Sequence, residues 1–275
     1  MIAAIVNYSF IQNALLIGLI LGIILPLIGL IILFRKIPFI ADALGHINMS
    51  AIALIYLLNS IVAISFFSKT IIILLWTILG GILIETISQK YQHYKEVSVM
   101  VVYSVSIALT MIFLNLSVGF QSSFYNILFG NINTITQEDL ITTVIASIIV
   151  ITILLINFKK ILIISIDEDL AKLYNVKLNF QRYLTIILIA ITVAMAIKIL
   201  GVLLVSSLVL IPNLASIRFA KSLKQTIILA IVFTEISFIL GFIVAYMLNM
   251  SSSAIIVLIA VIIYCLSFVI RVKNK

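Results

Sequence analysis

The chain has 275 residues, of which 64% are hydrophobic and only 9% are charged. Its mean hydropathy of +1.38 excludes a soluble globular domain, because so few polar residues cannot cover a water-facing surface. The net charge of +8 is explained below as a topology signal, and no motif supports binding of nucleic acid. We therefore expect an all-α, polytopic transmembrane helical bundle.

Apolar runs long enough for the roughly 20 residues of a spanning helix follow one another along the chain. The break between the sixth and seventh runs depends on Lys198 and Gly201, so eight spans stay open beside nine. Because the connections are mostly short, we predict a single transmembrane domain over residues 1–275. The nine candidate spans cover residues 10–34, 39–58, 70–88, 97–116, 139–158, 183–199, 201–217, 226–248 and 254–270.

Basic residues are distributed unevenly among the connections. Short cytoplasmic loops of membrane proteins carry an excess of Lys and Arg. With the amino terminus outside, 15 of the 17 basic residues fall on inner segments, and Lys69 and Lys198 are the exceptions. The pattern predicts an outer amino terminus and an inner carboxyl terminus. No basic residue precedes Arg35, so we expect the first span to be a retained helix and not a cleavable signal.

The second span carries ionisable residues at membrane depth. Asp42 and His46 are four residues apart, a spacing that places both side chains on one face of a helix. Pro38 suits a first helical turn, and at about 1.5 Å per residue Asp42 and His46 lie about 10 Å and 16 Å beyond Arg35. Each ionisable group there costs roughly 2.5 to 3.5 kcal/mol, which makes the pair a candidate functional site.

The same helical face continues toward the next turn. Met49 and Ser50 follow His46 on it, and Gly45 beside it permits close approach of another helix. We expect Met49 and Ser50 to line a pathway. Imidazole nitrogen and carboxylate oxygen are ordinary ligands for zinc and acceptable ones for manganese, and two such ligands bind reversibly, as transport requires. On spacing alone, a structural ion pair or a histidine satisfied by a neighbouring helix stays open.

Three further residues in apolar runs attract attention. Glu85 lies near the inner end of the third run, and Glu235 lies in the middle of the eighth. Either could face an aqueous cavity, but pairing with another helix is the commoner outcome. Cys265, the only cysteine, is expected to be a small buried hydrophobe.

Two connections are longer than the others. Residues 117–138 hold no basic residue and are predicted to lie outside, whereas residues 159–182 are charged and are predicted to lie inside. Asp167, Glu168 and Asp169 fit the first turn of a short helix, where acidic residues complement the helix dipole. The residues that follow at helical spacing are Leu170, Leu173, Tyr174 and Lys177. Such a helix either couples to a cytoplasmic partner or rests on the lipid surface.

The sequence offers no residues for enzymatic chemistry. It contains no G-x-x-x-x-G-K-[ST] loop for phosphate, and no CxxC pair, HExxH helix or recognisable Ser-His-Asp set. We therefore expect a chain that is not an enzyme and does not bind ATP in the usual way.

Four blocks give the sequence a family likeness. They are residues 10–56, FGNINTITQEDL at 129–140, ISIDEDLAKLYNV at 164–176 and ILGVLLVSSLVLIPNLASIRFAKSL at 199–223. Together they resemble the membrane permease subunits of bacterial zinc and manganese ABC importers, over nearly the whole chain. The resemblance implies a permease fold like that of type II ABC importers, in the cytoplasmic membrane of a bacterium.

The resemblance also implies partners and site residues. A cytoplasmic ABC ATPase subunit, an extracytoplasmic metal-binding protein and a second permease copy forming a homodimer are expected. Asp42 and His46 match the family's D-x-x-x-H block, which implies transient ligands for transported zinc or manganese and no permanently bound cofactor. The family's contact with its ATPase corresponds here to Asp167, Glu168, Leu170, Ala171 and Leu173.

The chain departs from the family pattern at several positions. Gly45 stands where a Ser is usual, Ser50 and Ala51 replace a Pro-Gly step, and residues 249–253 replace a D-x-P-x-G pattern. These changes keep the two metal ligands but leave gate shape and metal preference open.

Two other transport functions remain as alternatives. The first is a proton-coupled secondary carrier in which Asp42, His46 and Glu235 relay protons. The second is a siderophore or cobalamin-type ABC permease, which leaves the D-x-x-x-H block unexplained. A membrane scaffold would not need the buried pair at all.

Overall fold

A computed structural model describes residues 9–61, 66–91, 94–117, 128–130, 135–248 and 250–272. In these ranges, nine helices are long and apolar enough to cross a membrane, which confirms the predicted all-α bundle. The nine are α2 (Ser9–Phe34), α3 (Ile40–Ile61), α4 (Phe66–Lys90), α5 (Lys95–Leu116), α7 (Gln137–Ile166), α9 (Leu178–Leu200), α10 (Val202–Phe219), α11 (Leu223–Leu248) and α12 (Ser252–Val272).

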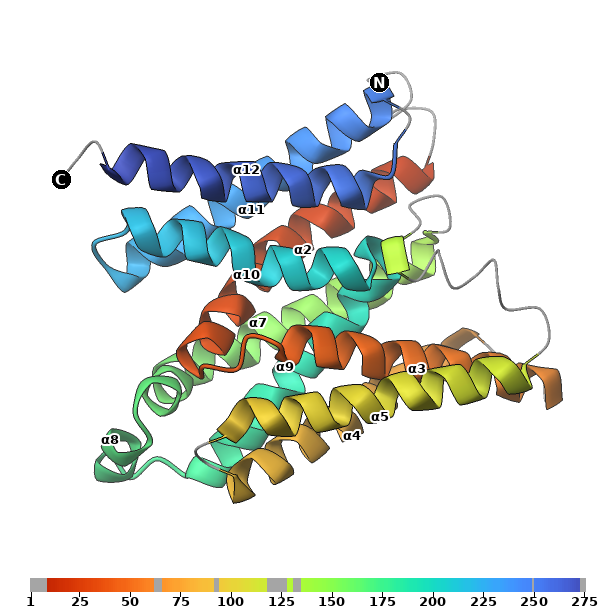
Figure 1. The fold of residues 1–275 in the computed structure, drawn as a ribbon, viewed down its shortest axis with the longest axis horizontal. Coiled ribbons are helices and arrows are strands. Elements are labelled where there is room, and N and C mark those ends of the chain that lie inside the picture. Colours follow the sequence, from red (N-terminus) through yellow and green to blue (C-terminus); the bar gives the residue numbers. More distant parts are fainter. Residues whose placement is uncertain are drawn as a thin grey trace.

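The long helices form one bundle, and one end of it collects the basic connections. The short helix α8 (Glu168–Leu173) projects at that end. The connections α2–α3, α4–α5 and α10–α11, which carry most of the remaining basic residues predicted to lie inside, lie at the same end as α8 (Figure 1). The charge pattern of the sequence therefore corresponds to a real polarity of the fold.

The predicted break between the sixth and seventh spans is confirmed. α9 ends at Leu200 and α10 begins at Val202, with only Gly201 between them. Gly201 has φ +79°, a conformation that glycine adopts without steric cost, and a Cβ there would overlap the backbone of Phe129 and Gly130. The side chain of Lys198, the other predicted marker of this break, lies outside the described residues.

The fifth span is longer than its apolar run. The run ends at residue 158, whereas α7 continues to Ile166 and comprises 30 residues. At about 1.5 Å per residue this is about 45 Å, which exceeds a hydrocarbon core of about 30 Å. The last turns of α7, with the exposed Lys159 and Lys160, therefore extend beyond the core and carry α8.

Two local predictions differ from the structure. α3 begins at Ile40, so Pro38 lies in the turn before the helix and not in its predicted first turn, because Lys36 adopts φ 56°. The prediction that Cys265 is buried is wrong, since its side chain is exposed on α12. The apolar character of Cys265 is satisfied on the outer, lipid-facing surface of a spanning helix, so burial inside the bundle is not required.

Candidate functional site

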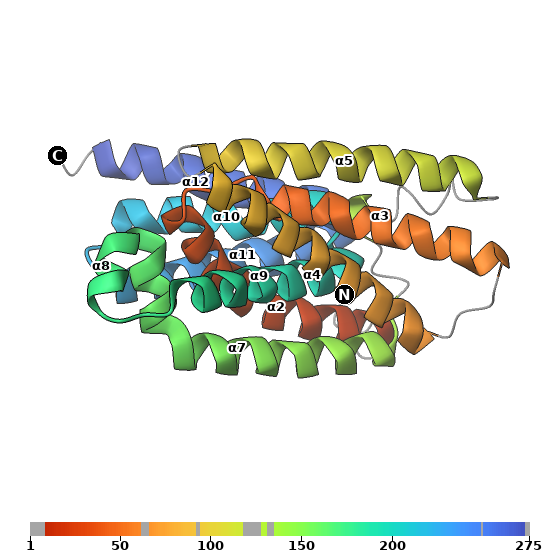
Figure 2. The ribbon, with the colours of Figure 1, turned by 90° about the horizontal axis from the view of Figure 1, so that it is seen from below.

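Asp42 and His46 lie on the first turns of α3. Asp42 belongs to the first turn, where the helix dipole stabilises a carboxylate, and His46 follows one turn later. Both side chains are half-buried. Figures 1 and 2 both show that α3 begins further from the basic end than the point where α4 ends and α5 begins, so the first turns of α3 are set back from that end.

Two helices pack closely around His46. Its ring lies edge-on to Tyr103 of α5, with ring centroids 4.7 Å apart and planes at 76°, a favourable aromatic geometry. On the adjacent position, a Cβ on Gly45 would lie 2.7 Å from Val202 Cγ1 of α10. The close approach predicted for Gly45 is therefore present, and it brings α10 against the turn of α3 that carries Asp42 and His46.

Met49 and Ser50 are both buried in this conformation. Met49 is 3% exposed. The Ser50 hydroxyl donates to Ile47 O at 2.7 Å and accepts the indole N–H of Trp76 at 3.0 Å. Ser50 thus joins α3 to α4 here, and its predicted role in lining a pathway stays a prediction.

Among the described residues, Asp42 and His46 form no group with further strong metal ligands. Within the described ranges, no group of three or more His, Cys, Asp or Glu side chains could hold a metal ion. The pair alone can supply one carboxylate and one imidazole. A protein site of two ligands needs water or another molecule to complete the usual four-coordinate shell of zinc.

Glu85 and Glu235, the two other acidic residues singled out in apolar runs, have opposite environments. Glu85 Oε2 accepts a hydrogen bond from Arg35 Nη2 at 2.6 Å, and both side chains are almost fully buried. The expected pairing with another segment is thus confirmed for Glu85. Glu235 differs, because its buried Oε2 has no hydrogen-bond partner among the described residues and its carboxyl group packs against Gly22 of α2.

The segment after α7 forms the predicted short helix. Asp167 caps α8 by accepting the backbone N–H groups of Asp169 at 2.8 Å and Leu170 at 3.2 Å. Ala171 is fully buried, whereas Leu170 and Leu173 are exposed. α8 therefore rests on the bundle through one face and presents apolar side chains on the other.

Glu168 ties α8 to two spanning helices. Lys95, the first residue of α5, donates to Glu168 Oε1 at 3.1 Å, and Arg182 of α9 donates to Oε2. Burial alone would raise the pKa of Glu168, but the hydrogen bonds and charges of Lys95 and Arg182 outweigh it and lower this pKa. The Glu168 carboxylate stays ionised at neutral pH and holds α8 in place.

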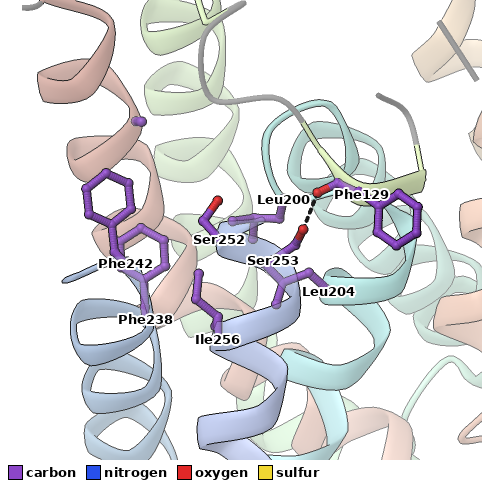
Figure 3. A pocket seen from close by; sticks show the side chains of 9 residues that line it. Phe129, Leu200, Leu204, Phe238, Phe242, Ser252, Ser253 and Ile256 are labelled. Carbon is purple, nitrogen blue, oxygen red and sulfur yellow. Dashed lines mark hydrogen bonds between the residues drawn. The ribbon is translucent and has the colours of Figure 1, made fainter. Parts of the chain in front are cut away.

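The end of the bundle opposite α8 carries Ser251 and Ser253, two of the residues that depart from the family pattern (Figure 1). Ser253, at the start of α12, donates to the carbonyl of Phe129 (Figure 3), and its hydroxyl lies 2.9 Å from that of Ser251. The two serines thus link α12 to the segment 128–130. The small pocket beside them is lined mainly by apolar side chains and offers no metal ligand, and Asn249 lies outside the described residues.

Sequence reasoning missed the neighbours of the predicted site. Tyr103 and Trp76 are aromatic residues within apolar runs, and nothing in their spacing distinguishes them from lipid-facing positions. For Lys95 and Arg182 a signal was available, because both are basic residues predicted at the same membrane face as the acidic segment 167–169. Opposite charges confined to one interface could have been paired.

Comparison with known proteins decides the family. Residues 7–271 match the ABC 3 transport family. The chain belongs to this family. It is 28% identical to the manganese transport system membrane protein MntC of Listeria monocytogenes over 98% of this chain and 93% of that protein. It is 30% identical to the high-affinity zinc uptake system membrane protein ZnuB of Buchnera aphidicola, over 94% and 95%.

A solved structure similar to this ABC 3 family protein has the same fold. PsaBC from Streptococcus pneumoniae, determined in complex with Fab, superposes with a TM-score of 0.82 and 26% sequence identity, covering 97% of this chain and 94% of the other. This chain has nine span-length helices in the described residues. It is therefore a multi-pass membrane protein of the transport-permease type.

Proposed function

We propose that the chain is the permease subunit of an ATP-driven importer that moves divalent manganese or zinc inward across the cytoplasmic membrane. The observation that carries this proposal is the match over nearly the whole chain to a transport family whose members include proteins named for manganese and zinc transport. The sequence expectation of metal handling, reached from Asp42 and His46, agrees with those names.

Asp42 and His46 are the proposed transient ligands. They share one face of α3, are half-buried, and lie set back from the basic end of the bundle (Figure 2). Two protein ligands release a metal more readily than a closed set of four. We propose that water or the same pair from a second copy in a homodimer completes the coordination.

α8 is the proposed contact for a cytoplasmic ABC ATPase. Leu173, its last residue, is 79% exposed and Tyr174, which follows it, is 70% exposed, and Glu168 in its first turn is held by Lys95 and Arg182. A rigidly held helix with an apolar outer face suits docking into a groove of a protein partner. The face holding α8 is then cytoplasmic, and an extracytoplasmic metal-binding protein delivers the ion at the opposite end.

Uptake of radioactive manganese and zinc by cells that lack their own importer tests the ligand assignment. Asp42→Asn and His46→Gln nearly preserve side-chain size but replace the carboxylate and the imidazole with amides, which are weaker metal ligands. Uptake should therefore fall at least about tenfold. Glu138→Gln removes an exposed acidic side chain from the start of α7 and serves as the control with unchanged uptake. Wild-type uptake by both site variants, inserted at normal levels, would refute the assignment.

The same assay separates the proton-coupled carrier from the proposed importer. An importer depends on its ATPase partner and keeps working when the proton gradient is dissipated at constant ATP. A secondary carrier shows the reverse dependence. Uptake that stops with the gradient and continues without any ATPase would contradict the proposal.

A further inference from the structure

α5 contacts both regions that the proposed function assigns. Lys95, its first residue, bonds to Glu168 of α8 at 3.1 Å. Tyr103, about two turns later, lies edge-on to His46 of α3 with centroids 4.7 Å apart. Eight residues of helix span about 12 Å, so one continuous helix joins the proposed ATPase contact to a proposed metal ligand.

The two helices that hold Glu168 differ in their freedom to move. α9, which carries Arg182, packs against α2, α3, α4, α7 and α10. α5 packs mainly on α3 and α4, and side chains such as Val101 and Val105 on its outer face are exposed. Because packed interiors resist local shifts, a displacement of α9 has to disturb five packed helices, whereas a displacement of α5 disturbs chiefly its packing on α3 and α4.

The contact surface of α5 suits a small sliding movement. Its buried stripe consists of small side chains, namely Ser98, Val99, Val102, Ser106 and Thr110. The hydroxyls of Ser106 and Thr110 both donate to carbonyls of α5 itself, at 2.7 Å. These hydrogen bonds survive a displacement of the whole helix, and sliding of packed helices is a common form of conformational change.

We propose that α5 transmits movement of α8 to the metal site, with Lys95, Glu168 and Tyr103 as positioning residues. Movement of α8 by the ATPase displaces the start of α5 through the Lys95–Glu168 pair. Tyr103 then changes the space and orientation available to His46. The inference rests on the proposed function, since it takes α8 as the ATPase contact and His46 as a ligand. Its consequence is a metal affinity that changes with the nucleotide state of the partner.

The test measures metal transported per ATP hydrolysed by the permease and its ATPase in proteoliposomes. Lys95→Met should leave ATP hydrolysis within about twofold of wild type and lower transport per ATP about fivefold, the lower range of allosteric coupling. Lys224→Met is the matched control, because Lys224 is an exposed lysine at the start of α11, outside α5 and α8, and its loss should leave the ratio unchanged.

Variants of Tyr103 test the other end of α5. Tyr103→Leu removes the aromatic edge from His46 and should lower transport per ATP to the same degree, whereas Tyr103→Phe keeps the ring and should retain the wild-type ratio. The double variant Lys95→Met/Tyr103→Leu should lose no more than the larger single loss, because both changes interrupt one connection.

Several results would overturn transmission by α5. One is a wild-type ratio of metal transported to ATP hydrolysed in Lys95→Met or Tyr103→Leu. Another is a double variant whose loss in this ratio equals the product of the two single losses. Loss of ATP hydrolysis together with uptake in Lys95→Met would also overturn it, because Lys95 would then belong to the docking surface. If Asp42→Asn and His46→Gln abolish uptake while Lys95→Met keeps the wild-type ratio, the proposed function stands and this inference fails. Wild-type uptake in the Asp42 and His46 variants would instead refute the proposed function itself.

Discussion

The surroundings of Glu85 and Glu235 show two ways in which an apolar bundle accommodates a carboxyl group. Glu85 of α4 is almost fully buried and paired with Arg35 at 2.6 Å. Glu235 of α11 packs against Gly22, and its Oε2 is buried without a hydrogen-bond partner. Glu85 therefore depends on a specific cation, whereas Glu235 depends on space left by a glycine. The difference predicts a large loss of stability when Glu85 is replaced by Gln and almost no loss when Glu235 is.

The largest effect is expected when the buried ion pair is broken. Glu85→Gln leaves the Arg35 guanidinium buried and unpaired, and its Nη1 already has no hydrogen-bond partner. Loss of one member of such a pair costs about 3–5 kcal/mol. Unfolding of the purified protein in detergent measures it. The double variant Arg35→Met/Glu85→Leu should recover most of the loss, and a double variant as unstable as Glu85→Gln would contradict the pairing argument.

A smaller effect is expected from filling the space beside Glu235. A Cβ on Gly22 would overlap the Glu235 carboxyl group, so Gly22→Ala forces that group to shift. Overpacking costs about 1–3 kcal/mol, and the low end applies because the displaced atoms are the end of a flexible side chain. The same unfolding measurement on Gly22→Ala/Glu235→Ala should show relief of the strain. Equal instability of both variants would show that the clash lies elsewhere.

Glu168 extends the comparison to a partly exposed carboxylate with two cations. Its pKa is lowered by Lys95 and Arg182, so its stabilising contribution is present above the ordinary pKa of 4.5 and is lost as pH falls through the lower folded value. At pH 7, Glu168→Gln should lose about 0.5 kcal/mol, since solvent screens the pair. Unfolding of both proteins across pH should show the difference vanishing in acid; a constant difference would contradict the ionic origin.

The smallest effect is expected for Glu235→Gln. This substitution makes the same chemical change as Glu85→Gln, but the described residues show no cation beside Glu235 to be left unpaired. The free energy of unfolding should change by less than about 0.5 kcal/mol, because Gln has the same shape as Glu and its introduction leaves no described cation unpaired. A loss comparable to that of Glu85→Gln would show that Glu235 has an ionic partner in the protein.

Features that follow from composition and local geometry could be read from the sequence. The nine apolar runs predicted the nine span-length helices, and Gly201 predicted the break between α9 and α10. The acidic cluster at 167–169 predicted α8. Each of these depends on hydropathy, backbone freedom or a helix dipole, which neighbouring residues alone determine.

Features that depend on packing between distant segments could not be read in this way. The position of Asp42 and His46 on one face of α3 followed from their spacing, but Tyr103 beside His46 did not, since any aromatic in an apolar run could face lipid. Pairing was expected for Glu85 and Glu235 alike, and only the packing of helices against each other separates them. Metal binding by Asp42 and His46 stays a prediction, which the uptake assay tests.

The single residue between α9 and α10 has a consequence for the tolerated length of the chain. Gly201 is packed against Phe129 and Gly130 and is flanked directly by α9 and α10, so no loop there can absorb an extra residue. An inserted residue that extended either helix would turn its side chains by about 100° and move them away from their neighbours. We expect insertions and deletions to be rejected at this position, whereas the exposed segment 174–177 after α8 should accept an inserted epitope without disturbing the spans.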